Sequence, residues 1–315
     1  MSKFILRLLG LLLFVIVIVR FNWQSFCSIL RELKPQSLII ACFLNVLRLF
    51  VETLRWDKLL KIQKISYKLK DAFLVFLSSA YAGTITPGGI GNFIRIFYLK
   101  DDVHIPIGAA SSSVIMDKLI ELLTVIGFGW WGLILLNIGI KTITVISLSI
   151  LLLSVFFLLI SYKKLHILLE RFLIKLFKVA KDVGRFDEER EIFYRFFRQL
   201  INIKLLEPVA LSFLAFIILL IQAFFVADAL NIQLSFIDLA KTFAFTRLIS
   251  RVIPVSFLGL GSKDITFTAI LNKMFKIGTI KGIAFSIIFL FTSYFVTAFA
   301  GAVCWLIKPI KIERS

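Results

Sequence analysis

The feature that most constrains this sequence is a series of apolar runs, several of them long enough to cross a lipid bilayer. A helix of about 20 apolar residues spans the ~30 Å hydrocarbon core of a membrane. The composition agrees, since 59% of the residues are hydrophobic and only 18% are charged. These values exclude a soluble globular enzyme, a disordered chain and a disulfide scaffold. We therefore expect an all-α, polytopic membrane protein with a single membrane domain over residues 1–315.

Six runs are predicted to span the membrane. They are Phe4–Val19, Ser37–Leu54, Ile107–Leu136, Ile143–Ile160, Val209–Ala227 and Ile280–Ile307. A signal peptide is the alternative reading of the first run, but no small-residue cleavage site follows it.

Two further apolar runs, Ala72–Thr86 and Leu239–Ile253, are shorter and are each followed by proline and glycine. At 1.5 Å per residue each would be about 22 Å long, too short to cross comfortably. A second short apolar piece follows each of them, at Phe93–Leu99 and Ile265–Met274. Short, paired and Pro/Gly-broken segments predict two re-entrant or discontinuous helix pairs.

The net charge of +18 indicates positive-inside topology and contact with anionic lipids rather than with nucleic acid. Residues 55–70 contain six Lys or Arg, residues 163–204 contain eleven, and residues 228–238 contain none. This asymmetry predicts a plasma-membrane protein with both termini in the cytoplasm. Residues 163–204 are expected to form an amphipathic linker on the cytoplasmic leaflet, or equally a linker whose charges only set the topology.

A proline followed by Gly-x-Gly occurs twice, 170 residues apart. It is Gly89–Gly91 behind Pro87, and Gly259–Gly261 behind Pro254. Given the expected topology, the two units enter the membrane from opposite sides. We therefore predict inverted repeats over about residues 37–136 and 208–307, the arrangement of many secondary transporters.

Each Gly-x-Gly is expected to break a helix at mid-membrane and to start a half-helix with a positive N-terminal end. Arg95 follows the first break, while Lys263 follows the second, with Ser262 as a helix cap. Arg247 and Arg251 share one helix face ahead of the second break. Four cations near two helix N-termini would suit a phosphate. The alternative is that the glycines serve only close helix packing.

Charged residues inside an apolar run are costly and are therefore functional candidates. Asp117 and Glu121 share a face of one predicted span, with Lys118 beside them. They either hold the repeats together by pairing with the arginines or form a network that exchanges partners as the site opens. Arg48 and Glu52, four residues apart, are expected to form a structural pair. The cysteines and histidines show no ligand spacing, so neither a metal nor a cofactor is expected.

These residues resemble the flippase-like integral membrane family, also described as the transmembrane region of lysylphosphatidylglycerol synthase. In its first motif Pro87, Gly91 and Arg95 match, while Asn92 replaces the usual acidic residue, which argues against proton or cation coupling there. The family's Glu-Arg-x-x-Asp is similar to Asp117–Glu121 here, with the charge signs kept.

Two further motifs extend the resemblance over nearly the whole chain. The family's Gly-Leu-Gly-x-x-Glu is similar to Gly259–Asp264, and its Arg-Trp pair to Arg55-Trp56. The resemblance implies a polytopic fold with re-entrant segments and a role in moving or handling lipids. We expect no soluble aminoacyl-transferase domain, which follows the membrane region in the synthases.

The leading functional expectation is a lipid translocase that carries an anionic or polyprenyl-linked headgroup between the repeats, without catalysis. The alternatives are an integral-membrane enzyme acting on lipid-linked substrates and a subunit that presents lipid to a separate synthase. The expected substrate-binding residues are Pro87, Gly89, Gly91, Asn92, Arg95, Asp117, Lys118, Glu121, Arg247, Arg251, Gly259, Gly261, Ser262, Lys263 and Asp264.

Overall fold

The structure, a computed structural model, describes residues 31–137, 185–252, 256–257 and 260–309. In these residues four helical stretches are long and apolar enough to cross a membrane. They are α3 (Pro35–Ile62), α6 (Ile107–Leu136), η2 (Ile203–Leu205) with α10 (Leu206–Ala229), and the continuous run of α13 (Thr279–Leu290), the π-helix η3 (Phe291–Phe295) and α14 (Val296–Ile307). The predicted all-α polytopic class is confirmed, and the predicted spans Phe4–Val19 and Ile143–Ile160 lie outside the described residues.

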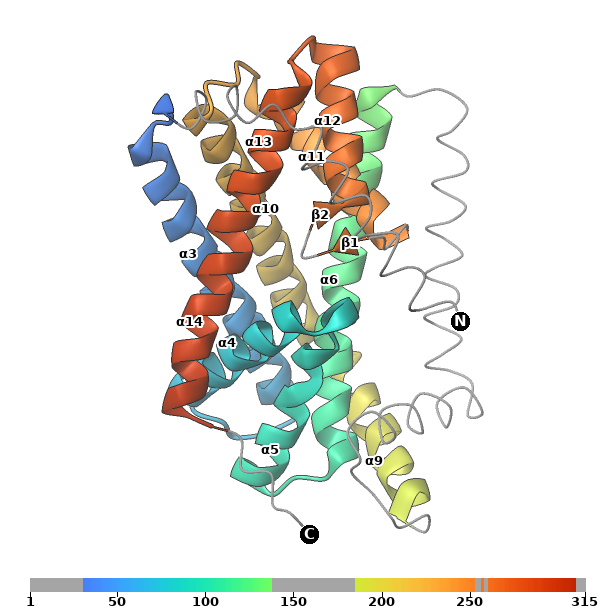
Figure 1. Ribbon diagram of the computed structural model, residues 1–315. Coiled ribbons are helices and arrows are strands. Elements are labelled where there is room, and N and C mark those ends of the chain that lie inside the picture. The colour runs from blue at the N-terminus through green and yellow to red at the C-terminus, as the bar shows by residue number, and fades with distance from the viewer. Residues whose placement is uncertain (1–30, 138–184, 253–255, 258–259, 310–315) are drawn as a thin grey trace, which may run out of the picture.

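The spans α3 and α10 lie side by side and antiparallel (Figure 1). At one end the backbone N–H of Lys34 donates to the carbonyl of Ala229 over 3.1 Å. At the other end Lys58 forms a 2.7 Å ion pair with Glu207. These two links fix which ends of the spans lie together.

The first short apolar run folds back on itself as a helical hairpin in the lower half of Figure 1. It consists of α4 (Leu69–Ile85), the 3-10 helix η1 (Pro87–Ile94) and α5 (Arg95–Val103). The chain turns after Thr86, whose extended backbone ends α4. Gly89 follows with a φ of +71°, a left-handed conformation that favours glycine. The helix after the break therefore starts at Arg95, one turn later than the sequence predicts.

The second short run forms a hairpin in the upper half of Figure 1. It consists of α11 (Phe236–Val252), the two-residue strands β1 (Ser256–Phe257) and β2 (Leu260–Gly261), and α12 (Ser262–Phe275). The strands pair antiparallel, with Ser256 opposite Gly261 and Phe257 opposite Leu260. The hairpins thus open towards opposite ends of the molecule.

The first helix of each hairpin packs against the last span of the other half, at a glycine. A Cβ on Gly132 of α6 would lie 2.3 Å from the carbonyl oxygen of Lys241 on α11. A Cβ on Gly301 of α14 would lie 2.4 Å from the carbonyl oxygen of Leu77 on α4. Small residues that allow backbones to approach are the usual packing device of membrane helices. The two halves therefore interlock through equivalent contacts.

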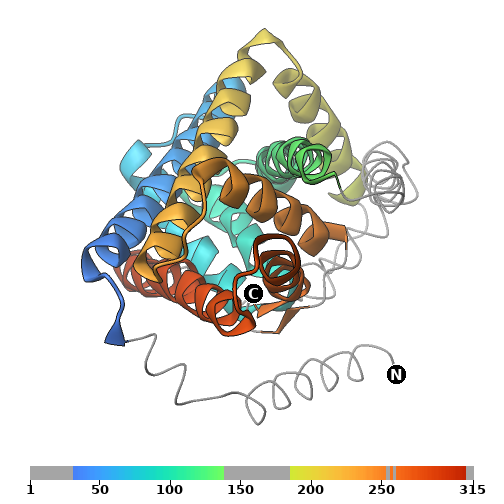
Figure 2. The ribbon, with the colours of Figure 1, turned by 90° about the horizontal axis from the view of Figure 1, so that it is seen from above.

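Helix α9 (Arg185–Leu200) packs outside the spans, against α6. Phe193, Phe197 and Leu200 bury its apolar side together with Met116 and Ile120 of α6. Figure 2 shows this helix beside the green α6 at the edge of the bundle. The rest of the predicted linker, residues 163–184, lies outside the described residues.

The close approach of α6 and α11 predicts how glycine substitutions in α6 behave. Gly132→Ala should lower the melting temperature, because the added methyl group must push α11 away; overpacking typically costs about 1–3 kcal/mol. Gly127→Ala is the matched control in the same helix, because its Cβ would meet nothing within 4 Å. Thermal unfolding of both variants in one detergent checks this, and equal melting temperatures would contradict the packing.

Candidate functional site

Two carboxylates one turn apart on α6 each form an ion pair with a different hairpin. Asp117 pairs with Arg95 at the start of α5, over 3.1 Å. Glu121 pairs with Arg251 near the end of α11, over 2.5 Å. A single turn of α6 therefore connects the turning regions of two hairpins that come from opposite ends of the molecule. This turn is the centre of the candidate site.

Asp117 also pairs with Arg55 of α3, and this contact is the shorter of its two. Arg55 Nε donates to Asp117 Oδ1 over 2.7 Å, while Arg95 Nη2 donates to Oδ2 over 3.1 Å. The side chains of Asp117 and Arg95 are 0% exposed and that of Arg55 is 2% exposed. A buried charge is tolerated only when it is paired and hydrogen-bonded, so these three groups depend on one another.

Further contacts tie this cluster to α10 and to the first hairpin. Arg55 Nη1 donates to Ser212 Oγ of α10 over 3.1 Å. Arg95 Nε donates to the carbonyl of Asn92 over 3.2 Å, and its guanidinium lies about 5 Å from the ring centres of Trp56 and Phe76. Desolvated cation–π contacts of this kind stabilise a buried arginine.

The cluster of Arg55, Arg95 and Asp117 carries two positive charges and one negative charge. Arg55 Nη2 and Arg95 Nη1 are buried and have no acceptor among the described residues. Each can therefore still donate hydrogen bonds to an oxygen that reaches it. Planar guanidinium groups are well suited to phosphate and carboxylate oxygens.

Glu121 is more accessible than Asp117 and is also shared between two cations. Lys118 Nζ lies 2.8 Å from one of its oxygens, and Arg251 Nη2 lies 2.5 Å from the other. The side chains of Glu121 and Arg251 are 25% and 43% exposed. Ion pairs with this exposure contribute less to stability and are easier to open than buried ones.

The start of α12 places a second cation over aromatic rings. Lys263 Nζ lies 5.6 Å from the ring centre of Phe289 and 5.4 Å from that of Tyr294. Its nearest carboxylate in the described part of the chain, that of Asp264, is 3.8 Å away. Arg247 interacts electrostatically with Tyr294, Arg251, Arg48 and Glu121, and no ion pair of Arg247 within 4 Å is found among the described residues. Tyr294 belongs to η3, and short π-helical segments are frequent at functional sites.

The predicted residues of the first turn are structural in their contacts. Gly91 N–H donates to the hydroxyl of Thr86 over 2.7 Å, and the Asn92 amide donates to the carbonyl of Gly89 over 2.9 Å. Pro87 begins the 3-10 turn itself. Asn92 also fills the space beside Gly83 of α4, where a Cβ would collide with it.

The second turn corrects one prediction about helix capping. Gly261, not Ser262, occupies the N-cap position of α12. Its own N–H donates to Asp264 Oδ2 over 2.8 Å, which is the reverse arm of a capping box, and Gly261 has no hydroxyl to accept from the N–H groups of the first turn. The physical reason is that β2 runs directly into the helix and leaves Ser262 as the first helical residue. Gly259 lies outside the described residues.

The contact network includes Arg55, Ser212 and Tyr294, which sequence reasoning did not assign to the site. In the sequence, Arg55 stands out only as half of an Arg-Trp pair that resembles a family motif. That resemblance was the signal for Arg55, whereas nothing in the sequence distinguishes Ser212 or Tyr294 from other residues of apolar spans. The predicted pair of Arg48 and Glu52 is confirmed, since Arg48 Nη1 lies 2.5 Å from Glu52 Oε1.

At the open end of the first hairpin, Lys308 forms ion pairs with Asp71 over 2.9 Å and with Asp102 over 2.7 Å. Burial opposes the charge of Lys308, but its hydrogen bonds to Asp102 and Asp71 raise its pKa above the usual value. These bonds join the end of α14 to both helices of the first hairpin. The hairpin is thus fastened at its open end as well as at Asp117.

The difference in burial between the two α6 carboxylates predicts different mutational costs. Asp117→Asn should strongly lower the melting temperature, because it leaves Arg55 and Arg95 buried without a full counter-charge; breaking a buried pair typically costs about 3–5 kcal/mol. Glu121→Gln should lower it much less, since Glu121 and Arg251 are partly exposed and the change leaves no fully buried charge unpaired. Thermal unfolding of the two variants side by side measures this difference. A destabilisation by Glu121→Gln as large as that by Asp117→Asn would contradict it.

The comparisons with known proteins agree with this architecture. The family model for the lysylphosphatidylglycerol synthase TM region matches residues 5–301. A UPF0104 membrane protein of Methanocaldococcus jannaschii is 23% identical over 325 residues, which cover 98% of this chain and 96% of that protein. No solved structure matches. With four described helical stretches able to span a bilayer and a family match over nearly its whole length, the chain belongs to the family of the lysylphosphatidylglycerol synthase transmembrane region and is an integral membrane protein.

Proposed function

We propose that this protein is a lipid translocase that passes an anionic or polyprenyl-linked headgroup between its two hairpins. The observation that carries the proposal is the excess of positive charge around the two α6 carboxylates. Six cations stand against three carboxylates there, namely Arg55, Arg95, Lys118, Arg247, Arg251 and Lys263 against Asp117, Glu121 and Asp264. An unbalanced cationic cluster inside an apolar protein favours an anionic ligand.

The arrangement of the hairpins supports a path across the membrane. Because they open towards opposite ends, we infer that both are re-entrant and that the halves are inverted repeats, as in many secondary transporters. The site would then lie near the bilayer midplane, where the hairpins meet α6. A headgroup that enters beside one hairpin could leave beside the other while its acyl chains stay in the lipid.

The orientation follows from the ends at which basic residues gather. The end of the molecule with α9 and the open side of the first hairpin carries many Lys and Arg, including Lys58, Lys61 and Lys64. The opposite end also carries Lys273, Lys276 and Lys281, so the two ends differ in how many basic residues they carry and not in whether they carry any. We infer that the end with α9 faces the cytoplasm of a cell-membrane protein, so that the end of α14 lies inside, and the predicted span Phe4–Val19 would bring the N-terminus to the same side.

The two carboxylates would have different roles during transport. Asp117 holds the first hairpin through a buried ion pair with Arg95. Glu121 holds the second hairpin through an ion pair with Arg251 whose side chains are partly exposed. A lipid phosphate that approaches Arg251 and Lys118 would compete with Glu121 for them. The second hairpin would then be released from α6 and could move. No nucleotide-binding motif is present in the sequence, so the energy would come from an ion gradient or from downhill lipid flux.

Arg247 provides the most direct test. It has no ion-pair partner among the described residues, so Arg247→Ala should leave the fold intact but remove a ligand-binding charge. A charge-assisted contact is worth about 1.5–3 kcal/mol, so translocation should slow roughly ten- to a hundredfold. Lys241→Ala is the matched control, because Lys241 lies on the same helix but pairs with Asp238 at the open end of the hairpin.

The readout is the movement of NBD-labelled phosphatidylglycerol across proteoliposomes, measured by dithionite quenching. Wild type and Lys241→Ala should translocate at the same rate, and Arg247→Ala should be slow. If wild type moves the labelled lipid no faster than empty liposomes do, the translocase assignment is wrong for this lipid class. If Arg247→Ala moves it at the wild-type rate, the cationic cluster is not the lipid path.

A further inference from the structure

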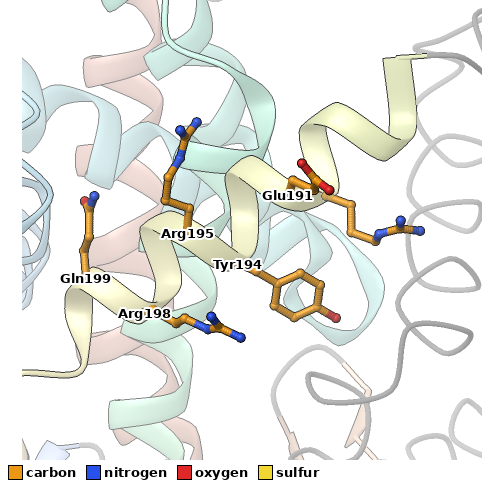
Figure 3. Close-up of a pocket in the computed structure, with 6 residues that line it drawn as sticks. Glu191, Tyr194, Arg195, Arg198 and Gln199 are labelled. Carbon is orange, nitrogen blue, oxygen red and sulfur yellow. The ribbon is translucent and has the colours of Figure 1, made fainter.

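The polar side chains of α9 and those inside the bundle differ in how far they are enclosed. Figure 3 shows the α9 side chains extending from the outward face of one helix, and every described residue that lines the pocket beside them belongs to that helix. Asn45 of α3 and Gln222 of α10 are instead 0% exposed, and both reach the last span at Ser293. Polar side chains buried inside a span are costly, which makes these two residues candidates for a specific role.

The side-chain amide of Asn45 uses both its N–H donors and its oxygen. Nδ2 donates to the carbonyl of Ser293 over 3.2 Å and to the hydroxyl of Thr297 over 3.1 Å. The amide oxygen accepts from Arg48 Nη2 over 3.0 Å. Because a guanidinium group can only donate, the oxygen must face Arg48 and the nitrogen must face the last span. The ion pair of Arg48 with Glu52 thus helps to orient Asn45.

Asn45 binds the last span at its π-helical segment η3. The backbone N–H of Val296 there reaches the carbonyl of Phe291, five residues earlier, which is the pairing of a π-helix. Inside a span, groups freed from the regular helix pattern are satisfied by neighbouring side chains because bulk water is absent. Asn45 supplies a donor to the carbonyl of Ser293, and Gln222 Nε2 donates to Ser293 Oγ over 3.0 Å. The segment is therefore held from both α3 and α10.

Tyr294 follows Ser293 in this segment and faces the second hairpin. Its ring centre lies 5.4 Å from Lys263 Nζ, and it interacts electrostatically with Arg247. A π-helical segment contains one residue more than the regular turn it replaces. Its return to an α-helix would rotate Tyr294 relative to Thr297 by up to roughly 100°, one residue's share of a turn. The contact between the ring and Lys263 therefore depends on the π segment.

We propose that Asn45 is a positioning residue of the candidate site. By holding the carbonyl of Ser293 it maintains the π segment, and the π segment keeps Tyr294 beside Lys263. The consequence for transport rests on the translocase function proposed above, in which Lys263 is one of the cations of the lipid path. The structural part of the proposal, that Asn45 sets the position of Tyr294, is independent of that function.

Chemical cross-linking between positions 263 and 294 tests the positioning without a transport assay. The parent is Lys263→Cys/Tyr294→Cys in the full-length protein with its three native cysteines changed to serine. The probe is a short bifunctional methanethiosulfonate reagent, applied well below the melting temperature of each variant. The parent should cross-link readily. Asn45→Ala should lower the yield roughly three- to tenfold, as expected when a buried hydrogen bond is lost.

Thr53→Val is the matched control on the same helix. Thr53 is 0% exposed, but its hydroxyl donates to the carbonyl of Leu49 within α3, so the change should leave the yield as in the parent. Gln222→Leu removes the second hold on Ser293 and should lower the yield, which decides the question if Asn45→Ala does not fold. A parent that does not cross-link, or equal yields for Asn45→Ala and Thr53→Val, would overturn the proposal.

A double-mutant cycle then tests whether Asn45 acts through Tyr294. Asn45→Ala should slow the translocation of NBD-phosphatidylglycerol in the otherwise unchanged protein, and it should slow it no further in a Tyr294→Ala background. Additive slowing would contradict action through this ring. A wild-type protein that moves no lipid would refute the translocase function, whereas the cross-linking yields would still decide the role of Asn45.

Discussion

The fold depends on one buried carboxylate, that of Asp117, which two arginines hold in place. Inside a bilayer, helices gain little from burying apolar surface against each other, because lipid tails are equally apolar. Polar links and close backbone contacts must therefore hold the helices together. Asp117 joins α6 to α3 through Arg55 and to the first hairpin through Arg95, and Arg55 continues the link to Ser212 of α10. Four elements thus meet at one charge.

The two hairpins carry similarly placed cations but differ in how their charges are balanced. Arg95 and Lys263 each follow a helix break and each lie over two aromatic rings. Arg95 shares the buried carboxylate of Asp117 with Arg55, whereas the nearest carboxylate to Lys263 in the described residues is that of Asp264, at 3.8 Å. On the second hairpin Arg251 is paired through a half-exposed bridge to Glu121. The first hairpin would therefore be the fixed half of the proposed lipid path, because its ion pair is fully buried, and the second would be the half that moves, because its ion pair is partly exposed.

Sequence patterns predicted those features that depend on local spacing. Apolar length predicts the four described spans, Pro and Gly predict the two chain reversals, and the four-residue spacing predicts the pair of Arg48 and Glu52. The partners of Asp117 could not be derived this way, since Arg55 is 62 residues distant and reaches it only through packing of α3 on α6. The cap at Gly261 was missed for a similar reason, because it depends on a strand pairing that two residues cannot signal. Tyr294 lies in a π-helical segment, which the sequence pattern does not signal.

The proposed transport cycle requires that Glu121 couples the second hairpin to α6 and releases it when a lipid phosphate arrives. A charge exchange tests this most directly, by comparing NBD-phosphatidylglycerol translocation in Glu121→Arg, Arg251→Glu and the double variant. Each single variant should be slow, since like charges then face each other across a contact that was 2.5 Å long. The double variant, which restores an ion pair of reversed sense, should recover much of the wild-type rate. A double variant no faster than the single ones, or a single variant at the wild-type rate, would contradict the claim.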